Sequence, residues 1–119
     1  EPGWEQVDAC LRGAAPCCVT AANQAEIIAK ALDRGVGQDD LRSILTALDY
    51  SVVGLTGEDG AAAGWMRGLT RPLGLSLGDR LCLAVAQRLN MPVLTADRPW
   101  VQLAPALGLD IRCIRPDSH

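Results

Sequence analysis

Three acidic residues lie where the chain is expected to pass between strands and helices. Asp97 directly follows a short apolar stretch, residues 92–96, and precedes a new helical pattern. Asp79 lies in the first turn of the helix expected from residue 76, and Glu26 lies about two turns beyond a first strand expected at residues 15–20. Carboxylates crowded together repel one another and take up protons unless a cation lies among them. If these three carboxylates converge, their chemistry is that of a divalent-metal site.

Alternating strand and helix patterns predict how the carboxylates are positioned. Parallel strands need crossover connections, which are usually helical, and ligands collect beyond the carboxyl ends of such strands. We therefore expect a parallel sheet covered by helices on both faces, with the three carboxylates brought toward one edge. The expected strands are residues 15–20, 50–55, 92–96 and 110–115, and the expected helices are residues 5–11, 21–34, 38–48, 57–69 and 76–89.

The helix from residue 76 has the clearest signals. Ser76 and Asp79 form the Ser-x-x-Asp pattern in which a hydroxyl and a carboxylate satisfy free amides at a helix start. The apolar segment formed by residues 81–86 and Leu89 is too continuous for a half-exposed surface helix, so we expect it to be covered on more than one side. Asn90 and Pro92 then end the helix.

Each carboxylate also has a purely structural interpretation. Glu26 precedes Lys30 by four residues, the favourable order for a helical ion pair. Asp79 serves equally well as the acidic half of a capping box, and Asp97 as the cap of the following helix. The residue four positions after Asp79 is Leu83, so this carboxylate has no obvious cationic partner on its own helix.

Composition indicates a single globular domain, residues 1–119, with a core built mostly from aliphatic side chains. The net charge of −3 gives no global positive field, so nucleic-acid binding would depend on local arginines. The three tryptophans, Trp4, Trp65 and Trp100, lie in helical patterns and are expected to pack in the core. Inward-facing positions are also expected at Leu41, Ile44, Leu45 and Leu48.

Cysteine usage and hydropathy suggest the compartment. The five cysteines are an odd number without metal-ligand spacing, which favours reduced thiols in apolar segments and a reducing, cytoplasmic location. No secretory leader opens the chain, and no uncharged run approaches the ~18 residues of a membrane span, so no membrane partner is expected.

Taken together, three motifs resemble a known family. Their order and separations are familiar: Asn23-x-x-Glu26, then Leu75-Ser76-Leu77-Gly78-Asp79-Arg80, then Leu94-Thr95-Ala96-Asp97-Arg98-x-Trp100. Over its whole length the chain resembles the PIN domain, and more narrowly the VapC-type toxins of bacterial toxin–antitoxin modules. The resemblance implies a three-layer α/β/α fold with a mostly parallel sheet.

The resemblance also implies the site. Glu26, Asp79 and Asp97 would be the catalytic and metal-binding residues of an acidic site for Mg²⁺ or Mn²⁺, with Asn23 and Thr95 as polar supports. Hard oxygen ligands favour these ions over zinc. The only histidine of the sequence is its last residue, where it is expected to be frayed.

The implied activity is a metal-dependent endoribonuclease that hydrolyses RNA phosphodiesters. Such a toxin would be held in check by an antitoxin protein and would form a homodimer. Arg80 and Arg98 follow the acidic residues and are candidates for binding substrate phosphates, although neighbouring side chains on a helix point about 100° apart.

One feature departs from the family. Its members begin with a central strand that ends in an aspartate, the fourth carboxylate, whereas this sequence starts just after that place. Without that strand, backbone groups on the neighbouring strands would be left unpaired, at about 1 to 3 kcal/mol each. We therefore expect that the natural protein has residues this sequence lacks, that another chain donates a strand, or that the sheet is rebuilt.

Two alternatives stay open. A non-catalytic PIN-like module that binds a partner or nucleic acid would use the same fold with its carboxylates as caps and ion pairs, and an inactive fragment of the nuclease would look the same. A nucleotide-binding α/β domain is disfavoured, because the sequence has neither Gly-x-Gly-x-x-Gly nor a Gly-Lys-Ser/Thr loop.

Overall fold

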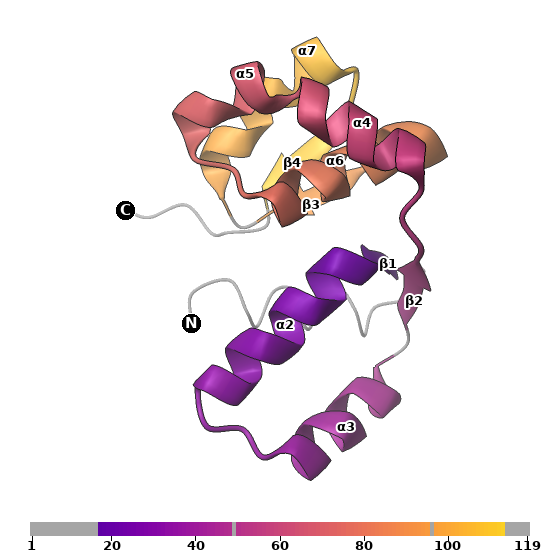
Figure 1. The fold of residues 1–119 in the computed structure, drawn as a ribbon, viewed down its shortest axis with the longest axis vertical. Coiled ribbons are helices and arrows are strands. Elements are labelled where there is room, and N and C mark those ends of the chain that lie inside the picture. The colour runs from indigo at the N-terminus through magenta and orange to yellow at the C-terminus, as the bar shows by residue number, and fades with distance from the viewer. Residues whose placement is uncertain (1–16, 49, 96, 114–119) are drawn as a thin grey trace.

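The computed structural model describes residues 17–48, 50–95 and 97–113, in which strands and helices alternate (Figure 1). The helix expected at residues 5–11 and Trp4 lie outside these residues. The elements are β1 (Cys17–Thr20), α2 (Ala21–Asp33), α3 (Gln38–Ala47), β2 (Tyr50–Val53), α4 (Gly57–Trp65), α5 (Arg67–Thr70), the 3₁₀ helix η1 (Arg71–Leu73), α6 (Leu77–Leu89), β3 (Val93–Thr95), the 3₁₀ helix η2 (Arg98–Leu103), α7 (Ala104–Leu107) and β4 (Ile111–Cys113).

The four described strands form two parallel pairs. β1 pairs with β2 from Cys17 opposite Tyr50 onward, and β3 pairs with β4 from Val93 opposite Ile111 onward. The predicted α/β class with parallel strands is confirmed. Among the described residues, β1 and β3 each have one strand neighbour, so these strands do not close into one sheet.

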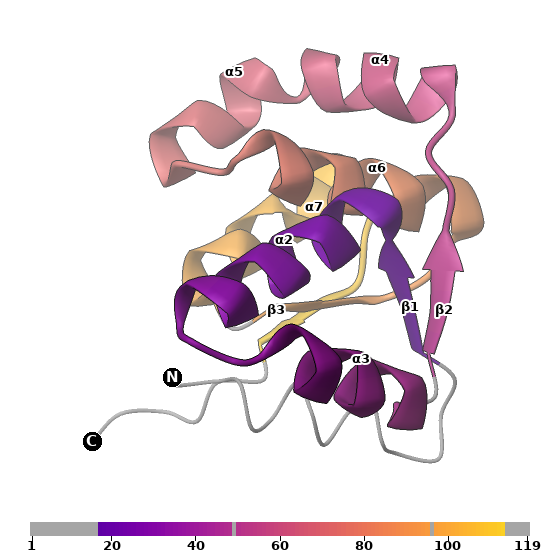
Figure 2. The same cartoon turned by 60° about the horizontal axis from the view of Figure 1, so that its bottom comes forward.

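The main core lies between α6 and the elements around it. α6 packs against α4 on one side and against α2, β1 and β3 on others, and Figure 2 shows α4 and α5 lying along its outer side. The expectation that its apolar run is covered on more than one side is confirmed. The buried cluster consists of Ala63, Met66, Leu75, Leu83, Ala84, Ala86, Val93, Trp100, Leu103 and Ile111.

The part of the chain before α4 buries fewer side chains. No residue of α2 is buried, and α3 buries only Leu41, with Leu48 buried just after it. Ile44 was expected to face inward, but 42% of it is exposed, and Leu45 is half-buried. The prediction for Ile44 is wrong because α3 packs mainly on α2, and one neighbouring helix covers only part of an apolar face.

The tryptophan prediction is half right within the described residues. Trp100 is buried in the core, whereas Trp65 is 88% exposed. The helix expected over residues 57–69 breaks at Met66 into α4 and α5, and it is the Met66 side chain that enters the core. Trp65 therefore lies at the end of α4 and faces solvent.

None of the helices in the described ranges is both long and apolar enough to cross a membrane.

Candidate metal centre

The first turn of α6 holds Asp79 through a reciprocal capping box. The Asp79 amide donates to Oγ of Ser76 over 3.1 Å, and the Ser76 amide donates to Oδ2 of Asp79 over 2.9 Å. Both amides would otherwise be free at the helix start. The predicted capping box is confirmed, and it uses Oδ2 while leaving the other carboxylate oxygen, Oδ1, outside the box.

Helix α2 positions Glu26. The hydroxyl of Thr20 caps the helix by accepting from the Asn23 amide over 3.0 Å, and the Asn23 side chain donates from Nδ2 to Oε1 of Glu26 over 3.2 Å. Asn23 is thus hydrogen-bonded to Glu26, and its role as a polar support of a metal site stays a prediction. The ion pair with Lys30 that would explain Glu26 structurally is not formed, both residues lying in the described part of the chain.

The carboxylate of Glu26 lies against Gly78, the residue immediately before Asp79. A Cβ atom added to Gly78 would lie 2.8 Å from Cδ and 3.0 Å from Oε2 of Glu26, and closer still to Oε1. Because α2 packs on α6, two residues separated by more than fifty positions meet at the same helix end. Glu26 and Asp79 are thus brought to the first turn of α6, where the partial positive charge of a helix start favours carboxylates.

Cys82 lies one turn further along α6, and the charges of both carboxylates act on its thiol. Burial, followed by the negative charges of Asp79 and Glu26, raises the pKa of the Cys82 thiol to about 11. Cys82 and Cys113 are free thiols, which agrees with the prediction of reduced cysteines for the described ones.

Thr95, the last residue of β3, is hydrogen-bonded to Asp97. Thr95 is buried, and its Oγ1 accepts from the Asp97 amide over 3.0 Å. The side chain of Asp97 is exposed and makes no capping hydrogen bond to η2. The interpretation of Asp97 as a helix cap is therefore wrong, and its carboxylate has no structural task of that kind.

The three predicted carboxylates are not gathered into one group. Within residues 17–48, 50–95 and 97–113 there is no cluster of three or more His, Cys, Asp or Glu side chains that could hold a metal ion. The structure brings Glu26 to the helix end that carries Asp79, and Asp97 is not grouped with them, so metal binding by the three residues stays a prediction. Two carboxylates and an amide are nevertheless a donor set that fits Mg²⁺, which proteins often bind through one or two carboxylates together with water.

The two arginine candidates have different surroundings. Nη1 of Arg80 donates to the carbonyl of Ala63 over 3.0 Å, which ties α6 to α4, and its Nε is buried without a hydrogen-bond partner. Arg98 opens η2 and is exposed. Phosphate binding stays a prediction for both.

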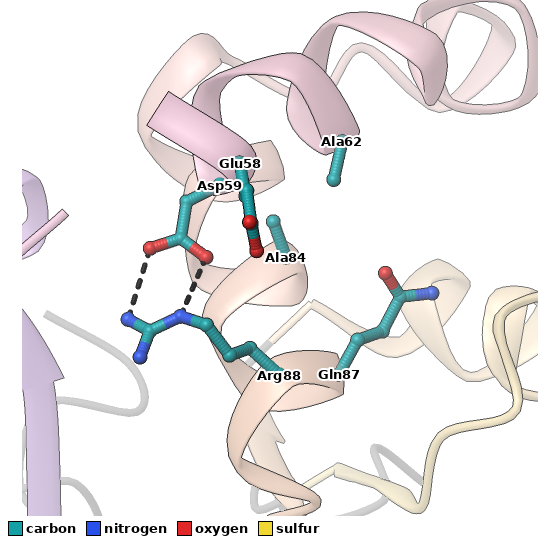
Figure 3. A pocket seen from close by; sticks show the side chains of 6 residues that line it. All are labelled: Glu58, Asp59, Ala62, Ala84, Gln87 and Arg88. Atoms are coloured by element: carbon teal, nitrogen blue, oxygen red, sulfur yellow. Dashed lines mark hydrogen bonds and ion pairs between the residues drawn. The ribbon is translucent and has the colours of Figure 1, made fainter. Parts of the chain in front are cut away.

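A pocket beside α4 is lined by Asp59, an acidic residue that forms an ion pair with Arg88 (Figure 3). Asp59 is 2% exposed and faces Arg88 of α6, whose Nε and Nη2 donate to the two carboxylate oxygens over 2.9 Å each. Asp59 also forms a capping box with Thr56. Hydrogen bonding to Arg88 lowers the pKa of Asp59 to about 2. The carboxylate is thus engaged by protein groups on both oxygens, and it fastens α4 to α6.

Sequence reasoning did not assign roles to Gly78 or to the Asp59–Arg88 pair. A glycine in the first turn of an otherwise regular helix is a signal for close approach of another group, and Ser76-Leu77-Gly78-Asp79 contains it. The ion pair joins residues 29 positions apart, and no local pattern indicates such a partner.

Comparison with known proteins supports this description of the fold. A family model described as the PIN domain matches residues 1–104. Among solved structures, one described as a toxin–antitoxin complex from Klebsiella pneumoniae is similar, with a TM-score of 0.69 and 14% sequence identity. The similarity covers 97% of this chain and 88% of that chain, and at this identity it shows the fold. A comparison with curated protein sequences gave no match.

Proposed function

Because this chain belongs to the PIN domain family, we propose that it is a metal-dependent endoribonuclease of the VapC type, the toxin of a toxin–antitoxin pair. PIN domains are generally nucleases that use divalent metals. The observation that carries the proposal is the meeting of Glu26 and Asp79 at the first turn of α6, where each carboxylate retains an oxygen that makes no hydrogen bond within the described residues.

The residues proposed to hold Mg²⁺ or Mn²⁺ are Glu26, Asp79 and Asp97. When bound, such an ion lowers the pKa of water and neutralises charge that develops on phosphate oxygens. Asn23 orients the Glu26 carboxylate through its side-chain amide, and Thr95 fixes the backbone of Asp97.

RNA is the proposed substrate, with Arg80 and Arg98 as candidate phosphate contacts. An antitoxin is the proposed protein partner, since the similar solved structure is described as a toxin–antitoxin complex. We also propose that the protein forms a homodimer, is located in the cytoplasm and consists of a single domain over residues 1–119.

RNA cleavage with and without Mg²⁺ or Mn²⁺ tests the activity. We expect cleavage only with metal, and a loss on the order of 100-fold or more for Glu26→Gln, Asp79→Asn and Asp97→Asn, since even outer-shell changes at metal sites cost 10- to 100-fold. Asp39→Asn, an exposed carboxylate in the first turn of α3, is the matched control and should leave cleavage unchanged. Metal-independent cleavage, or full activity in the three variants, would contradict the proposal.

A non-catalytic binding module is the second candidate, favoured by one observation: the Asp79 carboxylate already has a structural task in the capping box. Such a module would bind RNA or a protein partner without cleaving RNA, whether or not metal is present. In that case the three substitutions would leave binding unchanged, because uncharged amides replace the carboxylates without removing the helix cap.

A further inference from the structure

We propose that Gly78 is a positioning residue: because it has no side chain, it leaves the space beside Asp79 into which the Glu26 carboxylate fits. This inference rests on the proposed metal-dependent function. The backbone of Gly78 does not require glycine, because Gly78 lies within the regular helix α6 and has no left-handed backbone conformation. Its proposed role therefore depends only on the absence of a side chain.

The contact is specific to this glycine. A Cβ at Gly78 would lie closer than 3.0 Å to Oε1 and Cδ of Glu26, a separation that real Cβ atoms essentially never show, and 3.0 Å from Oε2. By contrast, a Cβ added at Gly60, Gly64 or Gly68 in α4 and α5 would meet nothing within 4 Å. Among the helical glycines of the described residues, Gly78 is therefore the one at which another side chain occupies the space that a Cβ atom would need.

The identity of the colliding atoms predicts what would move if position 78 were alanine. The colliding atoms belong to the end of the exposed Glu26 side chain and to no backbone, so an alanine at position 78 would displace that carboxylate and leave α6 in place. Alanine also has a higher helix propensity than glycine. Gly78→Ala should therefore move one metal ligand without weakening the fold.

The first experiment measures Mn²⁺ affinity by electron paramagnetic resonance of free Mn²⁺, together with thermal unfolding. We expect Gly78→Ala to bind Mn²⁺ about tenfold more weakly, the effect typical of disturbing the support of a metal ligand, with an unchanged or raised Tm. Gly60→Ala is the matched control, because it makes the same chemical change in an open helical position and should leave Mn²⁺ affinity unchanged.

Two further readouts separate positioning from a general structural effect. In a Glu26→Ala background, Gly78→Ala should cause no further loss of Mn²⁺ affinity, because the two residues act as one unit. In the metal-free protein, Glu26→Gln should shift the amide resonances of residues 77–79 when position 78 is glycine and leave them in place when it is alanine.

The outcomes distinguish the two proposals. If the wild-type protein binds no Mn²⁺ and cleaves no RNA, the proposed function fails and the role of Gly78 fails with it. If the wild-type protein binds Mn²⁺ and Gly78→Ala binds it equally well, or if the loss persists in the Glu26→Ala background, only the positioning role is overturned.

Discussion

Asp59 and Asp79 occupy the same position in two capping boxes, yet their surroundings give them different tasks. Each accepts a hydrogen bond from the amide of the residue three positions earlier, Thr56 or Ser76. Asp59 is buried and fully engaged by Arg88, whereas Asp79 is half-buried and follows Gly78, against which the Glu26 carboxylate lies. The same local pattern therefore produces a structural ion pair in one place and a candidate metal ligand in the other.

The Asp59–Arg88 pair makes stability depend on pH. Hydrogen bonding to Arg88 lowers the pKa of Asp59 from 3.8 to about 2 in the folded protein, so the folded state favours the ionised form. The stabilisation is therefore fully present above pH 4 and is lost as pH falls toward 2. Arg88→Ala should lower the free energy of unfolding at neutral pH, and its difference from wild type, measured by urea unfolding, should shrink between pH 4 and pH 2.

The exposed pair between Asp110 and Arg112 is the matched control for this prediction. Its side chains are 57% and 63% exposed, and such pairs contribute at most about 1 kcal/mol. Arg112→Ala should therefore change stability little at any pH. A pH-independent difference between wild type and Arg88→Ala would show that Asp59 is not held ionised by its partner.

At the scale of elements, α6 joins the core to the candidate site. Its apolar side chains lie between α4 and the strands, and its first turn receives Glu26 from α2. The helix was predictable from sequence because every signal is local: the capping box at Ser76, the apolar run, and Asn90, which ends the helix with φ of 53°. The sequence did not predict that the helix expected over residues 57–69 breaks at Met66 or that Trp65 and Ile44 are exposed. These features depend on which neighbouring element covers each side of a helix.

Two equivalent helix caps allow the structural and functional parts of α6 to be separated. Ser76→Ala and Thr56→Ala should each cost about 1 kcal/mol of stability, since each removes one side-chain cap. Only Ser76→Ala should also change Mn²⁺ affinity, because the Ser76 hydroxyl accepts from the backbone amide of Asp79 and so holds the backbone of this proposed metal ligand. Equal Mn²⁺ affinities in the two variants would mean that the cap of α6 does not serve the metal site.

At the scale of the whole molecule, burial is uneven. The main buried cluster extends from α4 to β4, whereas α2 contributes no buried residue and α3 contributes one. The alternation of parallel strands and helices was predictable from the sequence. The sequence did not predict this imbalance, because the helical patterns of α2 and α6 both contain apolar faces, and only tertiary contacts decide which face is covered.

Local stability should follow this distribution. We expect amide hydrogens of α2, α3, β1 and β2 to exchange faster than those of α6, β3 and β4, because segments with few buried contacts open at lower free energy. Hydrogen–deuterium exchange with mass spectrometry on fragments from the two parts measures this. Equal protection would show that the two strand pairs unfold as one cooperative unit.

The proposed function requires that the carboxylates of Glu26, Asp79 and Asp97 bind one ion together. Side-chain carboxyl ¹³C resonances followed during a Mg²⁺ titration test this directly, because each carboxylate reports its own surroundings. We predict that the three resonances shift together with a single Kd, while those of Asp33 and Asp39 stay in place. Separate affinities for the three carboxylates, or no shift at all, would contradict the metal site.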